Sequence, residues 1–477
     1  MGISLNPAAL LNGQGIDVAS LVQEILSESD GQLTGWQNEQ ATLQLQASAL
    51  SGINSDLSNL ATAVQALSDP VGALTAVSAT SSDNGVLSAT ATTSATAGAH
   101  QIVVSNLATA GLVYTSDFAG GAHASFLPNG VTSGEIDLQI GGSGGTSHPI
   151  TITQGTNDTL ATLASYINSQ NWGVTASVVT DANGSRLALV SQTTGTGGAL
   201  AITANSTSLT FSTPTGGTNA SLTIDGIPYS SATNTITGAI PGVTLNLAGA
   251  SPDETVQLTV GPDTGQATNA INNFVSAYNQ VINDINQQFT INASTNSQGP
   301  LGSDTALRSL QSSLMNDVTY SISGNGGLVN LASLGINMNN DGTLTVGTNA
   351  QGQTLNQVLQ SNPAAFLNFF QNAASSGFAN NFNTDLTNLT DPTIGVLNVD
   401  LTQNQTEQQD LSTRITNFET QLTAQQQQLT TEFDQVNASL QSYPLLLQQV
   451  TETLATLDTS NSGTTTGIAS PTLTSGL

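Results

Sequence analysis

The chain has 477 residues and no cysteine, and its three basic residues (Arg186, Arg308 and Arg414) face 31 acidic ones, for a formal net charge of −28. The absence of Cys and Lys excludes disulfides, thiolate zinc sites, P-loop lysines and Schiff-base chemistry. A chain this negative repels phosphate groups, and no stretch approaches 18 consecutive apolar residues, so we expect neither a nucleic-acid partner nor membrane insertion.

The charged residues make up only 7 % of the chain. The surface must therefore consist mainly of Ser, Thr, Asn, Gln and Gly, which is typical of exported surface structures. Residues 1–15 contain no basic segment and no long apolar core. We therefore expect no cleaved signal peptide, and export by another route.

Apolar residues recur at helical spacing in the N-terminal part of the chain, first between Val18 and Leu26. A seam with alternating steps of three and four, as in a coiled coil, follows at Leu50, Ile53, Leu57, Leu60, Val64 and Leu67. Gly31, Gly35 and Gly52 predict breaks or kinks in these helices. Asp69-Pro70 should end the helical region.

A β-rich block occupies about residues 76–262. Segments 135–140 and 149–153 predict a hairpin around a Gly-rich turn, and Asn183-Gly184 predicts a second hairpin. Between the hairpins, apolar residues from Leu160 to Ile167 predict a short helix capped by Asn157 or Asp158. Linkers rich in Gly and Thr near 193–198 and 212–219 indicate a second β-rich domain inserted within the first.

A further helical block follows the β-rich region. Apolar residues line one face from Ile271 to Phe289 and another from Leu307 to Val318, with a cap near Ser303 or Asp304. Residues 355–370 predict two short helices, with Pro363 at a first helical position.

A loop between these helices resembles half of a calcium site. Asn337, Asn339 and Asp341 occupy ligand positions 1, 3 and 5 of an EF-hand loop, and Gly342 occupies position 6. Position 12, which should be Glu, is Thr348, and a strand-like pattern follows where a second helix belongs. We therefore interpret Asn340-Asp341-Gly342 as a tight turn.

The C-terminal part carries a second seam, with predicted assembly positions at Leu411, Ile415, Phe418, Leu422, Leu429, Phe433, Val436 and Leu440. The polar residue Gln425 occupies one seam position, and the next two steps along the seam are both four residues long, which interrupts the alternation of three and four. Pro444 is expected to break or kink the helix, and residues 459–477 are Ser/Thr/Gly-rich and expected to be disordered. The two seams can cover each other or pair with other copies of the chain.

Catalytic and metal-binding patterns are missing from the sequence. His100, His123 and His148 are far apart and form no HxxxH or HExxH motif. The carboxylates are scattered, so a glycosidase-like pair stays open only for carboxylates that meet in the folded chain, and no spacing favours one. We therefore expect a protein that is not an enzyme and needs no cofactor.

Several segments, in order, resemble the bacterial flagellar filament-capping family, hook-associated protein 2. The segments similar to this family are residues 15–26, 97–110, 159–195, 232–247, 274–286, 299–314, and 333–346 followed by 355–370. The turn around Asp341 belongs to the last of these motifs, as a connector between elements. The resemblance covers roughly residues 15–455; the scarcity of basic residues and Pro444 depart from the family pattern.

The resemblance implies a ring, most often a pentamer, at the growing tip of the flagellar filament. Its β-rich heads would form a plate and its terminal helices would form legs that contact the filament end. Such a cap promotes folding and insertion of exported flagellin and prevents its loss. The implied partners are flagellin, the hook–filament junction protein, the flagellar type III export apparatus and a cytoplasmic export chaperone. The implied location is extracellular, at the flagellum tip.

The expected fold class is α+β, with helical legs enclosing two β-rich heads. The expected parts are an N-terminal export and helix region (1–40), a helical leg (41–75 and 265–398), a β-rich head (76–110 and 217–264), an inserted head with one short helix (111–216), a C-terminal coiled coil (399–458) and a disordered tail (459–477).

Alternatives remain open at this point. A secreted surface adhesin with glycan-binding β-rich heads has the same organisation, although no cluster of exposed aromatic residues marks a sugar platform. Flagellin or a hook–filament junction protein shares the helical ends but lacks the ordered motifs between 97 and 370.

Overall fold

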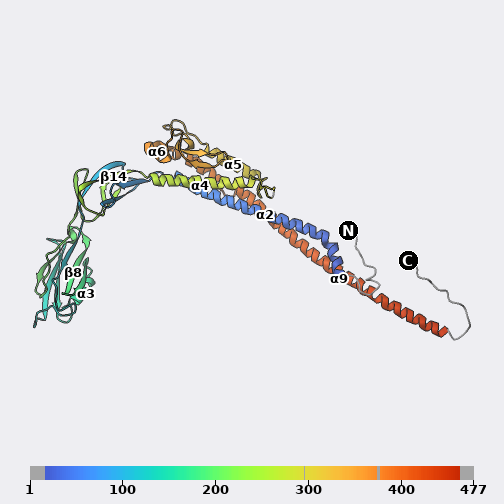
Figure 1. Cartoon of the computed structure of the whole chain (residues 1–477), viewed down its shortest axis with the longest axis horizontal. Helices are drawn as coiled ribbons and strands as arrows, with labels where there is room; N and C mark the ends of the chain where they lie inside the picture. The colour runs from blue at the N-terminus through green and yellow to red at the C-terminus, as the bar shows by residue number, and fades with distance from the viewer. Residues whose placement is uncertain (1–16, 295, 373–375, 462–477) are drawn as a thin grey trace. The chain divides into compact units, whose positions relative to one another are not determined.

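A computed structural model describes residues 17–461 except 295 and 373–375, and shows an α+β protein (Figure 1). The chain divides into two compact units. Unit 1 comprises Met1–Ser58, Gln280–Leu314 and Leu386–Leu477; unit 2 comprises Asn59–Asn279 and Met315–Asp385. The helices are α2 (Val18–Ser68), α3 (Leu160–Ser169), α4 (Thr264–Phe289), α5 (Thr305–Val318), α6 (Leu355–Ser361), α7 (Pro363–Phe370), α8 (Phe378–Leu389) and α9 (Val396–Asn461).

The first β-rich core contains a five-stranded sheet in the order β1-β14-β3-β10-β11 and a three-stranded sheet in the order β12-β13-β2. All the pairings are antiparallel. The strands are β1 (Val77–Ser81), β2 (Leu87–Ala91), β3 (Gly98–Asn106), β10 (Ala220–Ile224), β11 (Ile227–Ser231), β12 (Thr235–Ile240), β13 (Val243–Leu247) and β14 (Ser251–Pro262). Alternating apolar side chains such as Ile102, Val104, Val256 and Leu258 form its core, as expected for sheets with one buried face.

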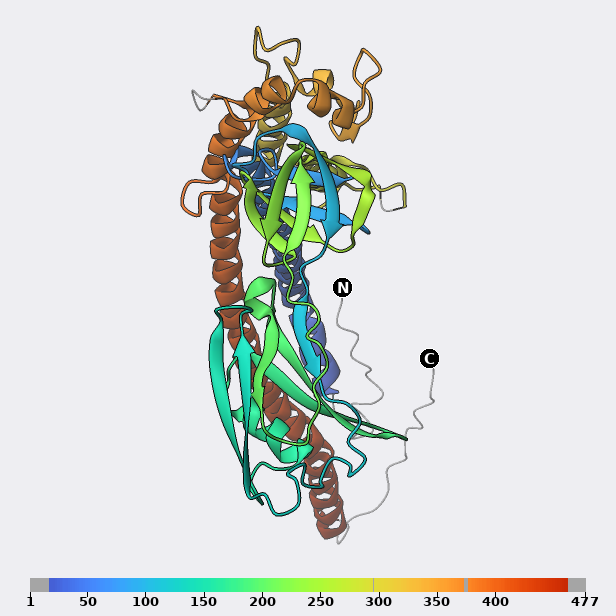
Figure 2. The same ribbon diagram turned by 90° about the vertical axis from the view of Figure 1, so that its left-hand side faces the viewer.

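The inserted domain has a separate core between two three-stranded sheets, β4-β8-β7 and β6-β5-β9. The strands are β4 (Ala110–Tyr114), β5 (Ser133–Ile140), β6 (Thr146–Thr153), β7 (Val174–Asp181), β8 (Gly184–Thr194) and β9 (Leu200–Asn205). Helix α3 packs against β7 (Figure 2) and buries Leu160, Leu163 and Ile167. Two cores in one β-rich block confirm the predicted insertion, and both predicted hairpins form.

Aromatic packing dominates the helical part of unit 2. The rings of Phe274, Phe369, Phe370, Phe378 and Phe382 are fully buried and contact one another. The small hairpin of β15 (Ile336–Met338) and β16 (Leu344–Val346) belongs to the same unit and is fixed to α4 by Asn279, whose side chain bonds both the N–H and the C=O of Leu344. The predicted helix pair at 355–370 is confirmed, with Pro363 at the first helical position of α7.

Three local details differ from the sequence-based expectations. No break occurs at Gly31, Gly35 or Gly52, and α2 is continuous through them, because packing along a long helix outweighs about 1 kcal/mol lost at each glycine. No break occurs at Pro444 either, since a proline removes one backbone donor and need not end a helix. The cap of α3 is Thr159, which exchanges hydrogen bonds with Thr162.

Helix α9 also runs to Asn461, three residues into the expected tail. The remainder of that tail, and the N-terminal segment 1–16, lie outside the described residues.

Candidate assembly surface

The central feature of unit 1 is an antiparallel pair of helices formed by α2 and α9 (Figure 1). Asn54 Nδ2 donates to Asn398 Oδ1 at 2.9 Å, Asn404 Nδ2 donates to Gln46 Oε1 at 3.3 Å, and Gln408 Nε2 donates to the Leu43 carbonyl at 3.3 Å. As the residue numbers of these contacts increase along α9, those of their partners on α2 decrease, so the two helices run antiparallel. Segments more than 340 residues apart in sequence therefore support one another as a leg-like helical pair.

Aromatic and aliphatic contacts continue this pairing toward the start of α2. The ring of Trp36 packs edge-on against Phe418, with centroids 5.1 Å apart. Val18, Val22 and Leu26 form a small buried cluster against which Leu422, Leu429 and Phe433 pack. The apolar stripe of each helix is thus covered by the other within one chain.

All six N-terminal seam residues are buried. Leu50, Ile53 and Leu57 lie in unit 1, and Leu60, Val64 and Leu67 lie in unit 2, with exposed fractions of 0–2 %. Their interpretation as helix-packing positions agrees with this burial. Any role in contacts between chains stays a prediction.

The C-terminal seam residues are less uniformly buried. Leu411 and Ile415 are buried, Phe418, Leu422, Leu429, Phe433 and Leu440 are half-buried, and Val436 is 47 % exposed. Gln425, interpreted from the sequence as a polar seam position, is exposed. Burial therefore decreases along α9 toward its C-terminus.

The polar residues in the contact between α2 and α9 were missed in the sequence. Asn404 is only 7 % exposed, and it accepts a 2.5 Å hydrogen bond from Gln408 besides donating to Gln46. Asn404 and Gln408 continue the spacing of three and four residues backward from Leu411. Their spacing was therefore a signal in the sequence that could have identified them. Polar residues at seam positions commonly fix the register of paired helices.

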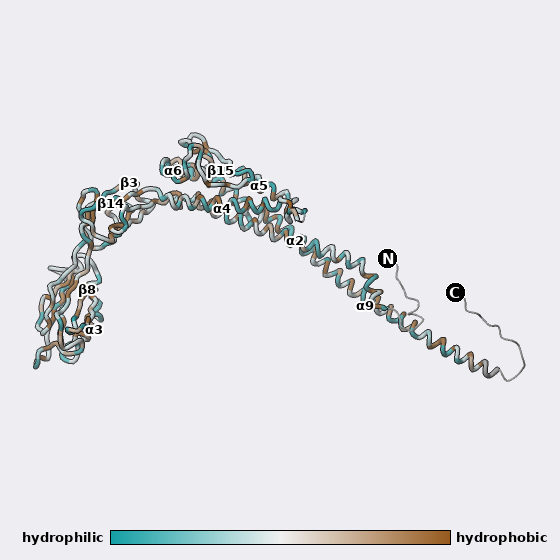
Figure 3. The backbone as a smooth tube through the Cα atoms, in the orientation of Figure 1, coloured by the Kyte–Doolittle hydropathy of each residue, from teal (hydrophilic) through white to brown (hydrophobic). Residues whose placement is uncertain are grey.

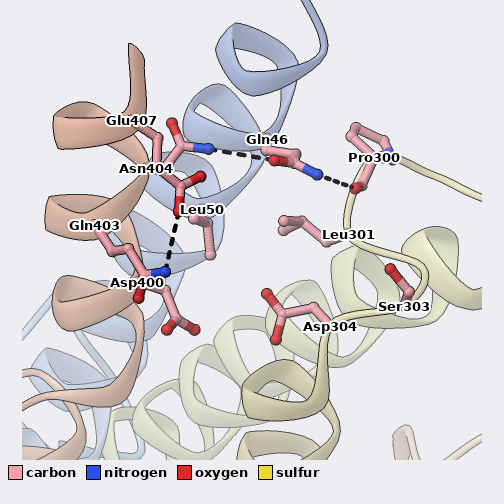
Figure 4. A pocket seen from close by; sticks show the side chains of 10 residues that line it. All are labelled: Gln46, Leu50, Pro300, Leu301, Ser303, Asp304, Asp400, Gln403, Asn404 and Glu407. Atoms are coloured by element: carbon pink, nitrogen blue, oxygen red, sulfur yellow. Dashed lines mark hydrogen bonds between the residues drawn. The ribbon is translucent and has the colours of Figure 1, made fainter. Parts of the chain in front are cut away.

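A pocket of about 210 Å³ opens beside these amides (Figure 4). Gln46 spans it, receiving the hydrogen bond from Asn404 and donating to the Pro300 carbonyl at 3.2 Å. Asp400 and Asp304 both line it, and burial followed by the charge of Asp304 raises the pKa of Asp400. In the described part of the chain no group of three or more His, Cys, Asp or Glu side chains is arranged to hold a metal ion.

A larger groove of about 660 Å³ runs between α2 and α9 further along the pair. Leu26, Leu33 and Leu422 contribute apolar surface, and Asp30, Glu419 and Asp434 contribute carboxylates. A groove of this kind suits an amphipathic helix that carries basic residues beside its apolar stripe. This chain has only three arginines and no lysine with which to supply such a helix.

Unit 2 contains a pair of carboxyl groups that the sequence did not indicate. Asp317 and Asp385 line the same small pocket, beside Phe378, Phe382 and Tyr320. Burial, the hydrogen bond with Asp385 and the charge of Asp385 together raise the pKa of Asp317 to about 7. The pair resembles two acids that share one proton, because like charges this close resist ionising together.

The false calcium loop is a turn, as interpreted from the sequence. Asp341 Oδ1 accepts hydrogen bonds from the backbone N–H and the hydroxyl of Thr343 at 3.0 and 2.6 Å, which lowers the pKa of Asp341. Gly342 has a φ of 84°. The carboxylate thus holds the β15–β16 turn in place.

Two of the three histidines have specific partners. His100 Nδ1 lies 2.8 Å from Asp225 Oδ2, next to the β10–β11 turn. His148 stacks on Trp172, whose ring also meets Tyr166 edge-on. The sequence did not indicate this aromatic cluster, and both Tyr166 and Trp172 pack against the core of the inserted domain.

None of the helices among the described residues is long and apolar enough to cross a lipid bilayer.

Comparison with known families gives three matches. The family model of the flagellar hook-associated protein 2 N-terminus matches residues 14–111, and that of the C-terminus matches residues 217–443. The flagellin hook IN motif matches residues 135–193, within the inserted domain. The matches follow the order of the motifs quoted above and reach both helices of the α2–α9 pair.

Individual relatives carry the same description. The B-type flagellar hook-associated protein 2 of Pseudomonas aeruginosa is 28 % identical over 68 % of this chain and 73 % of its own length. Flagellar hook-associated protein 2 of Helicobacter pylori is 25 % identical over 35 % of this chain and 25 % of its own length. Among solved structures, the D1-D2-D3 domains of the flagellar cap protein FliD from Escherichia coli are similar with a TM-score of 0.54 and 26 % identity, over 75 % of this chain and 99 % of that one.

Proposed function

Because this chain belongs to the flagellar hook-associated protein 2 family, we propose that it caps the bacterial flagellar filament. In this proposal several copies form a ring at the distal tip. The ring promotes the folding and insertion of exported flagellin and prevents its loss to the medium. Its role is structural, and no bond is made or broken.

The observation that carries the proposal is the joint match of both family models to the two ends and the first β-rich head. It is supported by the fold similarity to the Escherichia coli protein, which is a flagellar cap protein. Flagellin, the hook–filament junction protein, the export apparatus and an export chaperone are proposed as partners on the same basis. A pentameric ring is proposed from the family resemblance alone.

The helix pair of unit 1 suits a leg that contacts a growing polymer. Its contacts mix buried Leu and Ile with Asn and Gln, such as Asn404 and Gln46, so the pair is only moderately apolar. The groove lined by Asp30, Glu419 and Asp434 offers negative charge to a helix that carries basic residues. We propose this groove as a contact site for a neighbouring flagellar subunit.

Export through the flagellar type III apparatus is proposed as the route to the filament tip. The chain contains no cysteine, so no disulfide has to be broken before it is threaded unfolded. The location proposed is therefore extracellular, at the end of the flagellum.

The adhesin alternative lacks a specific supporting observation. Tyr166 and Trp172 are half-buried and pack against their own domain core, whereas sugar binding by stacking needs an accessible aromatic face. We therefore retain only the cap function as a proposal.

A deletion strain tests the cap function. Flagellin in the medium is compared with flagellin on the cells, in the deletion strain and after expression of the full chain from a plasmid. The proposal expects monomeric flagellin in the medium, no filaments, and restoration by the plasmid. Filaments of normal length in the deletion strain would contradict it, and glycan binding by the purified protein would then favour the adhesin.

A further inference from the structure

The inserted domain has two strands that lie at the edges of its sheets. The strand orders are β4-β8-β7 and β6-β5-β9, so β7 and β6 each have one side on which no other described strand is paired. An edge strand presents N–H and C=O groups to which a strand of another chain can bind. Folded proteins commonly block such edges with charged side chains, above all lysine, and this chain contains no lysine.

Strand β7 has the composition of a segment that pairs readily with other strands. Residues 174–180 read VTASVVT and contain no charged residue, no proline and no glycine. Short uncharged segments with high β-propensity are prone to strand pairing. Hydrophobic and hydrophilic positions alternate along the strands near the label β8 in Figure 3, and Val179 of β7 is 57 % exposed. An open β7 edge would therefore be a surface for association.

The side chain of Asn168, on α3, occupies this edge. Asn168 Nδ2 donates to the carbonyl of Ala176 at 2.8 Å, and Asn168 Oδ1 accepts the N–H of Ala176 at 2.8 Å. The amide thus makes both hydrogen bonds that a neighbouring strand would make with Ala176. Because backbone groups alternate in direction along a strand, Val174, Val178 and Thr180 face the same edge. Asn168 therefore interrupts the row of groups to which another strand would bind.

The edge of β6 is blocked in a similar way. Asn157 Oδ1 accepts the N–H of Thr153 at 2.8 Å, and Asn157 Nδ2 donates to the carbonyl of Thr151 at 3.0 Å. Pro149 lies two residues before Thr151 and has no N–H to donate. Positions 149, 151 and 153 face one edge, so three successive positions of β6 are closed to another strand.

We propose that Asn168 closes the β7 edge against a second copy of this chain, as Asn157 and Pro149 close the β6 edge. A second copy is the occupant that fits, because β7 is complementary to itself. Two β7 strands can pair antiparallel about a twofold axis, which brings uncharged residues together. The two Asp181 side chains then lie at opposite ends of the contact and do not oppose each other. The proposal does not depend on the cap function.

Substitution of Asn168 tests the proposal. Asn168 is exposed, whereas Asn157 is only 5 % exposed and its replacement would leave buried backbone groups unpaired. Asn168→Ala removes both hydrogen bonds and opens the edge. Asn168→Asp also loses the donated hydrogen bond, but it places a negative charge at the edge, which opposes strand pairing. The control is Asn129→Ala, at an exposed turn of the same domain, and circular dichroism checks the folding of each full-length variant.

The mass of each protein is measured by sedimentation at increasing protein concentration. The proposal expects Asn168→Ala to reach about twice the mass of the wild type at the same concentration, because one open edge joins two copies. Asn168→Asp and Asn129→Ala should match the wild type. Equal masses for all four proteins would overturn the proposal. An equal increase in Asn168→Asp and Asn168→Ala would also overturn it, because a loss of stability would then cause the association.

Hydrogen exchange locates the contact. In dilute Asn168→Ala, the N–H of Ala176 is expected to exchange roughly tenfold faster than in the wild type, because its acceptor is gone. At a concentration at which the variant associates, exchange over residues 174–180 is expected to become slower again. Association that leaves the exchange of residues 174–180 unchanged would contradict the proposal.

Discussion

The indole of Trp36 packs edge-on against the ring of Phe418, with centroids 5.1 Å apart and an interplanar angle of 70°. These residues stand on α2 and α9, near opposite ends of the sequence. The contact lies between the hydrogen-bonded amides of Asn404 and Gln46 and the apolar cluster around Val22. It is thus a central point of the helix pair that we interpret as the leg.

Substitution Phe418→Ala is expected to lower the free energy of unfolding of the helix pair by about 1–2 kcal/mol. The value lies below that for a fully buried ring because Phe418 is half-buried, and it includes the edge-on contact with Trp36. Urea unfolding followed by circular dichroism measures it. Leu45→Ala is the control, since Leu45 is 60 % exposed on α2, and it should change the free energy by less than about 0.5 kcal/mol. Equal losses of unfolding free energy in Phe418→Ala and Leu45→Ala would contradict a stabilising role of the Trp36–Phe418 contact.

Asn404 and Gln46 provide a test of the polar seam. Asn404→Ala leaves the Gln46 amide oxygen without its donor and is expected to cost about 1–2 kcal/mol of stability. In a double-mutant cycle with Gln46→Ala, the two effects should be coupled by about 0.5 kcal/mol or more. Additive effects would mean that the hydrogen bond contributes nothing to pairing.

The Asp317–Asp385 pair predicts a pH dependence of unit 2. Burial and the neighbouring Asp385 raise the pKa of Asp317 to about 7 in the folded protein, so the folded state holds a proton on Asp317 that the unfolded state loses near pH 4. The stability that this proton provides is therefore fully present below about pH 4. The stability of unit 2 should fall as the pH rises from about 4 to 7, and stay level above that. The shift corresponds to about 4 kcal/mol, which partial exposure of the group reduces to about 1–2 kcal/mol.

Asp317→Asn should remove this dependence and raise the midpoint of thermal unfolding at pH 7.5. The control is Asp253→Asn, at an exposed position on β14, which should leave the pH profile unchanged. A profile that keeps its slope between pH 4 and 7 in Asp317→Asn would show that the pair does not cause it.

The turn at Asp341 predicts that calcium does not change the thermal stability of the protein. Its carboxylate already binds the backbone N–H and the hydroxyl of Thr343, and position 12 of the loop supplies no carboxylate. Thermal unfolding in 5 mM calcium and in excess EDTA should therefore agree to within about 1 °C, since a bound ligand stabilises the folded state by mass action. A higher midpoint in calcium would contradict the structural interpretation of the loop.

The sequence was most informative where local chemistry decides the structure. Asn183-Gly184 located the β7–β8 hairpin, and steps of three and four residues located the helix seams. The cap of α3 was missed because Asn157 and Asp158 are used elsewhere: their side-chain oxygens accept the backbone N–H groups of Thr153 and Gly155. A local pattern does not reveal such competing partners.

Features that depend on distant contacts were not predictable from one sequence. Gly31 and Gly52 remain helical because α9 packs along α2, and that partner lies more than 300 residues away. Asp317 and Asp385 approach each other only when α5 and α8 fold together. Asn404 and Gln408 could have been predicted as helix-contact positions, since they continue the seam spacing. They were missed because the search for seam positions followed apolar residues.

The central claim, that this protein caps the flagellar filament, is tested most directly by adding it back from outside. Full-length purified protein is added to growing cells of the deletion strain, and immunogold labelling with electron microscopy locates it. The account predicts gold at the distal ends of the filaments and filament growth that resumes only where an end is labelled. Label spread along the cell surface, or filament growth without label at the ends, would contradict it.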